Sequence, residues 1–266
     1  MRAEAARWPR VTAFVLGLVV VAGCALNKGS ALAGDFEQEW AGTPDVTTVD
    51  AKGDNTLPFL GSASGTLVVA DGTPAERVTE LADELRRYVA EHDGTKGRIT
   101  ADGVSFTVVA DEAHTGEVVA LWRSLTADGR VVEADIDTVP AGDVRWRIEV
   151  DAVDAPAAMA VFDDLTADGD RHRSLSAVTS LEVRTGADVR PGLHVETGAD
   201  GRTPGEAIAA YEAVRARHPV VGATLKPARA AVRLAPGADL AAATALARSA
   251  APTLGDGIEV DIDRGN

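Results

Sequence analysis

The chain of 266 residues is poor in the side chains that build crosslinks, because it has only one cysteine. A single cysteine excludes a disulfide framework and a zinc site made of several cysteines. The net charge is −15, which argues against DNA or RNA as a partner, because phosphate binding needs a positively charged surface. Aromatic residues are scarce at 4%, but 45% hydrophobic and 25% charged residues are typical of a globular protein.

Long hydrophobic runs are also missing. The uncharged segment 11–21 is too short to cross the ~30 Å hydrocarbon core of a membrane as a helix. It follows a basic start that carries Arg2, Arg7 and Arg10, and small residues stand at its end. This combination is typical of a secretory signal peptide, and we predict one over residues 1–23.

The end of this segment has the sequence Val21-Ala22-Gly23-Cys24. It resembles the lipobox of bacterial lipoproteins, in which the signal is cleaved before the cysteine, here after Gly23. The resemblance covers only this segment and implies that Cys24 is lipid-modified and holds the protein on the outer face of the cell membrane. The chain also resembles the lipoproteins of unknown function in high-GC Gram-positive bacteria, the actinobacteria. The alternative is an ordinary secreted protein with a stray cysteine.

Residues 24–61 show little periodicity and contain scattered glycine, serine, aspartate and proline. This composition predicts a flexible tether with one strand at most, over 45–51. Trp40 lies in the tether, and we therefore expect it to be exposed and available to a partner.

Strand and helix patterns alternate after the tether. The first set consists of strand 66–70, helix 73–92, strands 98–101 and 105–110, helix 115–125 and strand 131–137. This βαββαβ order is that of a ferredoxin-like sandwich, in which helices cover one face of an antiparallel sheet. We assign it to residues 62–138.

The C-terminal part repeats this order and two of its sequence landmarks. Thr-Pro-x-Glu occurs at 73–76 and 203–206, and Glu-x-Asp-Ile-Asp occurs at 133–137 and 259–263. These repeats indicate an internal duplication. We predict an α+β protein of repeated ββα units that form two ferredoxin-like modules. Residues 139–266 hold the second module and a βαβ joint, and a continuous chain of ββα units is the alternative.

Acidic residues alternate along the last strand of each module. Because side chains alternate across a strand, each row lies on one face; the rows are Glu133, Asp135 and Asp137, and Glu259, Asp261 and Asp263. Carboxylate oxygens bind Ca²⁺ or Mg²⁺, so each row is a candidate for weak cation binding. Neighbouring acids of a row are ~7 Å apart, however, and the alternative is a solvated sheet face whose acids meet basic neighbours.

No catalytic or transition-metal signature is present. The five histidines, at positions 92, 114, 172, 194 and 218, never show a spacing such as His-x₃-His, so we predict neither a metal centre nor a cofactor. We predict a non-catalytic binding or scaffolding protein of the cell envelope that uses the sheet face left bare by the helices. Its partners are the membrane, through the lipid on Cys24, and an unidentified envelope protein or ligand. The alternatives are an envelope enzyme with a site of scattered Asp, Glu and Arg, and a weak divalent-cation binder.

Overall fold

The computed structural model describes residues 27–57, 60–139, 144–167, 171–173 and 175–264. Helices and strands alternate along these segments in a regular order. In chain order the elements are α2 (Lys28–Trp40), β1 (Val46–Leu57), β2 (Leu60–Val69), α3 (Ala75–Glu91), β3 (Thr95–Ala101), β4 (Val104–Val108), α4 (Glu112–Thr126), β5 (Val131–Thr138), β6 (Trp146–Ala152), α5 (Ala155–Thr166), β7 (Val178–Thr185), β8 (Gly192–Glu196), α6 (Gly205–Arg215), β9 (Val220–Lys226), β10 (Arg229–Leu234), α7 (Leu240–Ala250), the 3-10 turn η1 (Gly255–Gly257) and β11 (Ile258–Ile262).

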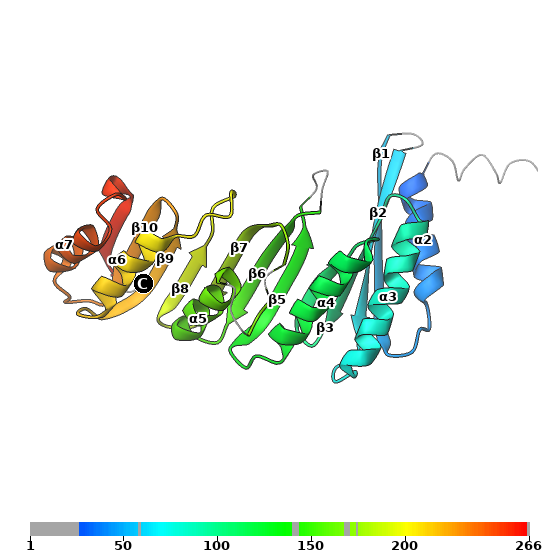
Figure 1. Cartoon of the computed structure of the whole chain (residues 1–266), viewed down its shortest axis with the longest axis horizontal. Helices are drawn as coiled ribbons and strands as arrows, with labels where there is room; N and C mark the ends of the chain where they lie inside the picture. The colour runs from blue at the N-terminus through cyan, green and yellow to red at the C-terminus, as the bar shows by residue number, and fades with distance from the viewer. Residues whose placement is uncertain (1–26, 58–59, 140–143, 168–170, 174, 265–266) are drawn as a thin grey trace, which may run out of the picture.

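The eleven strands form one sheet in which each strand lies beside its neighbours in the sequence, from β1 to β11 (Figure 1). Strands joined by a short turn, such as β3 and β4, are antiparallel. Strands joined by a helix, such as β4 and β5, are parallel, because the helix returns the chain to the end of the sheet from which it started.

Repeated ββα units are therefore confirmed, and the βαββαβ order occurs both from β2 to β5 and from β8 to β11. The sheet is mixed rather than antiparallel, and it continues without a break through the region where two separate modules were expected. The physical reason is that the strand after each helix pairs directly with the strand before it. No gap is left in which a further strand of a ferredoxin-like module could pair.

One face of the sheet is apolar and lies under the helices. Ile99, Phe106, Ile136 and Ile148 are paired in one row across β3 to β6, and all four are buried. The residues between them point to the opposite face, because side chains alternate along a strand. Helices on one face of the sheet, as predicted from the sequence, are thus confirmed.

The hand of the helical connections keeps the other face bare. Successive parallel pairs run in opposite directions while the chain advances across the sheet in one direction. With all helices on the same face, successive crossovers must alternate between right-handed and left-handed, although about 98% of such connections in proteins are right-handed. Uniform right-handed crossovers would have placed helices on both faces. The alternation leaves one sheet face, here called the open face, without a covering helix among the described residues.

The N-terminal segment differs from the flexible tether expected from its composition. Helix α2 packs on β1 and β2, and its Phe36 and Trp40 are buried. Phe36 contacts Tyr88 of α3 edge-on, with ring centroids 5.5 Å apart. Trp40 is therefore part of the core and not an exposed contact. Leu32, Phe36 and Trp40 recur at helical spacing, but the glycines and charged residues between them led the composition to predict a tether.

Candidate functional site

The acidic row of β5 lies on the open face beside basic side chains. Asp135 is ion-paired with Arg98, and Asp137 contacts both Lys96 and Arg98. Burial acts to raise the pKa of Asp137, but hydrogen bonds from Lys96 and Thr107 and the nearby positive charges outweigh it, and the pKa is lowered. The partners of these two acids are therefore lysine and arginine side chains. This is the alternative to metal-ion binding that the sequence left open.

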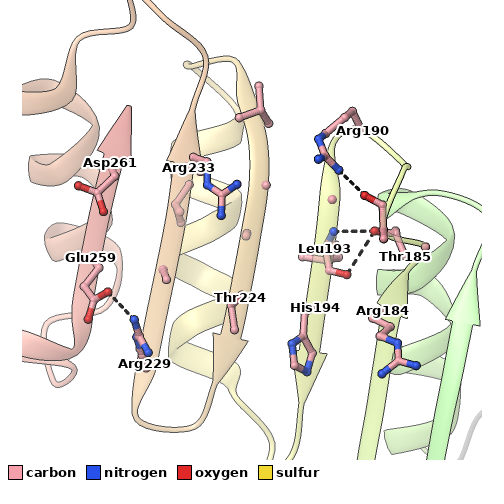
Figure 2. A pocket seen from close by; sticks show the side chains of 18 residues that line it. Arg184, Thr185, Arg190, Leu193, His194, Thr224, Arg229, Arg233, Glu259 and Asp261 are labelled. Atoms are coloured by element: carbon pink, nitrogen blue, oxygen red, sulfur yellow. Dashed lines mark hydrogen bonds and ion pairs between the residues drawn. The ribbon is translucent and has the colours of Figure 1, made fainter. Parts of the chain in front are cut away.

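The remaining predicted acids do not converge on one point. Glu133 lines a shallow depression together with Asp151 and Arg184. On β11, Glu259 pairs with Arg229 at 2.6 Å, and Asp261 points into a separate hollow (Figure 2). Asp263 follows the end of β11. The six acids of the two rows therefore lie in different environments and do not form one common cation site.

The hollow lies on the open face over β7 to β11 and has a volume of about 480 Å³. Four arginines line it: Arg184 from β7, Arg190 from the segment before β8, and Arg229 and Arg233 from β10 (Figure 2). In a chain of net charge −15, this is a local concentration of basic side chains, of which Arg184 is ion-paired with Asp151 and Glu182. The only acids among its lining residues are Glu259 and Asp261.

Two glycines form the floor of the hollow. Gly192 of β8 is paired with Gly222 of β9, which is paired in turn with Arg233 of β10. A Cβ atom added at Gly222 would meet only the Gly192 carbonyl oxygen, at 3.6 Å, which is ordinary contact. Neither glycine has a positive φ. Packing and backbone conformation therefore do not require glycine here, and the missing side chains are what opens the hollow.

The arginines of the hollow differ in how far they are neutralised. Arg229 is paired with Glu259, whereas Arg190 donates to the carbonyl oxygens of Ala187 and Val189. Within the part of the chain that the structure describes, Arg233 has no ion pair. A guanidinium with free donors in a concave surface is suited to bind a carboxylate or a phosphate group.

A second group of polar side chains lies next to the hollow. His194 of β8 has its Nε2 atom 3.1 Å from Glu196 Oε2 and 3.4 Å from Glu182 Oε1 of β7. This group was not predicted from the sequence, and the His-x-Glu pattern of β8 is the only local signal that could have indicated it. Glu182 could not be added to it, because the register of β7 against β8 is not visible in either strand alone.

A buried network on the helix side of the sheet links Asp128 to His172. His172 Nε2 lies 3.0 Å from Asp128 Oδ2, and His172 Nδ1 lies 2.9 Å from Ser124 Oγ. The side chains of His172 and Asp128 are 0% and 3% exposed. Hydrogen bonds from Arg130 hold the pKa of Asp128 well below its usual range despite burial, while burial lowers the pKa of His172.

This Ser-His-Asp series differs from a catalytic triad in its accessibility. His172 is enclosed, so a substrate cannot contact its ring. Arg130 also pairs with Asp164 of α5, at 2.6 Å. The network therefore ties the end of α4 to α5 and to the segment that carries His172, and we interpret it as structural.

Comparison of the chain with protein-family models, with curated proteins and with solved structures found no match in any of the three. Gly23 and Cys24, the predicted cleavage and lipidation positions, lie outside the described residues. Within the described residues, none of the helices combines the length and the apolar character needed to cross a membrane.

Proposed function

We propose that this chain is a lipid-anchored, extracytoplasmic binding protein of the cell envelope, without catalytic activity, that holds an acidic partner in the arginine-lined hollow of its open face. The observation that carries the proposal is the hollow itself. It gathers four arginines in an acidic chain, on a sheet face that none of the described helices covers. Arg233, which has no ion pair within the described residues, supplies the free donors for an anionic group of the partner.

The position of the hollow supports binding of a partner away from the anchor. Cys24 precedes the first described helix, which begins at Lys28, by only a few residues. At ~3.5 Å per residue, this connection holds the N-terminal end of the sheet within about 15 Å of the lipid. The hollow lies over β7 to β11, at the other end of the sheet (Figure 1). Strands spaced ~4.8 Å apart place it about 40 Å from β1.

The anchor is tested by the substitution Cys24→Ser. A lipobox without its cysteine is neither cleaved nor acylated, and we expect the variant to remain unprocessed or to be released from the membrane. Detergent phase partitioning and the electrophoretic mobility of the protein measure this outcome. Detergent partitioning and electrophoretic mobility that are both identical to those of the wild-type chain would refute the lipid anchor, because an unprocessed chain differs in mobility and a released chain differs in partitioning.

The binding site is tested by the substitutions Gly222→Val and Arg233→Glu. Valine at 222 fills the floor of the hollow in a position that tolerates a Cβ atom, and glutamate at 233 reverses the unpaired charge. We expect each to lower the yield of the partner adduct formed by chemical crosslinking in intact cells by about tenfold or more, one bidentate contact to a charged group being worth ~1.5–3 kcal/mol.

Arg87→Glu provides the matched control, because Arg87 is exposed on α3, on the helix side of the molecule. It changes the net charge of the chain by the same amount as Arg233→Glu and leaves the hollow intact. If Arg87→Glu and Arg233→Glu lowered the yield of the partner adduct equally, the net charge of the chain would explain the loss. That result would contradict a site in the hollow. Gly222→Val also keeps or raises the melting temperature, because valine favours strands.

We further propose that the two halves of the sheet arose by duplication of a ferredoxin-like βαββαβ unit. The repeated landmarks support this, because Thr73 and Thr203 precede corresponding helices and the two acidic rows lie on corresponding strands, β5 and β11. In the present sheet the two units are joined edge to edge through β6, α5 and β7.

A further inference from the structure

Two glutamates face each other across a strand pair next to the hollow. Glu182 of β7 and Glu196 of β8 are directly opposite in the antiparallel register, on the open face. Like charges in this relation destabilise a sheet unless a cation lies between them. His194 lies on the same face as Glu196, two positions earlier on β8, and completes a set of three side chains.

The imidazole of His194 faces the gap between the two carboxylates. Its Nε2 atom is buried and close to both carboxylate oxygens, yet it makes no hydrogen bond of acceptable geometry. The three potential ligand atoms lie within 4.8 Å of one another. Bond lengths of about 2.0–2.2 Å to zinc require ligand atoms roughly 3.4 Å apart. Small side-chain rotations therefore suffice to bring the three atoms onto one ion.

Basic neighbours hold both glutamates. Lys226 Nζ contacts Glu196 through Oε1 at 2.7 Å, and this leaves Oε2 directed at His194. Arg184 contacts Glu182 through Oε1 at 3.1 Å, the same oxygen that lies 3.4 Å from His194 Nε2, so a bound ion shares this oxygen or displaces Arg184, which also pairs with Asp151. Such outer contacts orient metal-binding carboxylates in proteins. All three ligand positions are on paired strands, which keeps their backbone rigid.

We propose that Glu182, His194 and Glu196 bind one divalent transition-metal ion of the zinc class. One imidazole nitrogen with two carboxylate oxygens favours Zn²⁺ over Ca²⁺ and Mg²⁺, which take oxygen ligands. Three protein ligands leave a coordination position for water or for an anionic group. Because His194 also lines the hollow, the ion adds positive charge at its rim. This site goes beyond the proposed partner binding and does not depend on it.

Isothermal titration of the full chain with Zn²⁺ alone tests the site, on protein purified without a histidine tag. We expect one Zn²⁺ per chain. His194→Ala, Glu182→Gln and Glu196→Gln should each weaken binding at least about tenfold, as losses at metal sites do. His114→Ala is the matched control, because His114 lies 2.9 Å from a single carboxylate, that of Asp111. This variant should bind Zn²⁺ as the wild-type chain does.

The glutamine variants separate loss of the site from loss of the fold. Each keeps the shape of the side chain and removes the opposition of like charges, so the metal-free melting temperature should stay the same or rise. Absence of Zn²⁺ binding by the wild-type chain at millimolar metal would overturn the proposal, and so would wild-type affinity in His194→Ala. Binding of the acidic partner is tested by crosslinking in the Arg233 variant, which does not measure Zn²⁺. Failure of the zinc proposal therefore does not decide the partner proposal, and the reverse also holds.

Discussion

The burial of His172 makes the stability of the protein depend on pH, because it outweighs the contact with Asp128, which favours the protonated ring. Burial lowers the pKa of His172 in the folded protein, whereas the unfolded chain titrates near ~6.5. As the pH falls through that range, the unfolded chain takes up a proton that the folded chain does not, and the folded state loses stability. The pKa of Asp128 is lowered in the folded state. Asp128 therefore stabilises the folded protein above pH ~4, and this stabilisation is lost in stronger acid.

We therefore expect the free energy of unfolding to be lower at pH 5 than at pH 7.5. Urea denaturation at the two pH values measures the difference. In His172→Gln the amide still donates to Asp128 but does not titrate, so the variant should show a smaller difference between the two pH values. A wild-type chain with the same stability at both would contradict a neutral, enclosed His172.

Single residues show where the sequence was informative. Alternation on the strands correctly places Asp135 and Asp137 opposite the apolar face. His194 could not be recognised as a candidate ligand, because its second carboxylate comes from a neighbouring strand. Local spacing contains no information on which strands pair or in what register.

At the scale of elements, helix α2 shows how packing overrides composition. Its sequence contains glycine and several charged residues, which predicts an unstructured segment. The helix is held by Phe36, which packs on Gly65 of β2, where a side chain would collide with the ring. The flat surface that glycine provides on the sheet becomes visible only when the two segments are brought together.

The docking of α2 is tested by comparing Gly65→Ala with Gly34→Ala. A Cβ atom at Gly65 would lie 2.3–2.5 Å from atoms of the Phe36 ring, and we expect a loss of about 1–3 kcal/mol in the free energy of unfolding. A Cβ atom at Gly34, in the exposed face of α2, meets nothing within 4 Å. Its better helix propensity should stabilise the protein by up to ~1 kcal/mol. If α2 were a loose tether, neither substitution would change urea denaturation.

At the scale of the whole molecule, the chain forms an extended layer. Each strand contacts its neighbours in the sequence, and the strand spacing of ~4.8 Å makes the sheet about 50 Å wide. The sequence predicted the repeating units and the side on which helices pack. It left two modules and a continuous chain of ββα units both open, because strand periodicity does not specify the partner of a strand, and the structure shows the continuous sheet.

Among the described elements, the open face is bare only because successive crossovers alternate in hand. The hollow and the candidate metal ligands both lie on it. The helix side carries surface ion pairs, such as Arg77 with Glu80, as the open face does. A partner that binds through the open face should contact residues of that face and leave the helices accessible.

The most direct measurement is photocrosslinking in intact cells from one position on each face. A photoreactive residue replaces Thr224, which lines the hollow on β9, or Ala245, which is exposed on α7. Binding through the open face predicts a discrete partner adduct from position 224, diminished when Gly222→Val is added, and none from position 245. Adducts from position 245 alone, or equally from both positions, would contradict it.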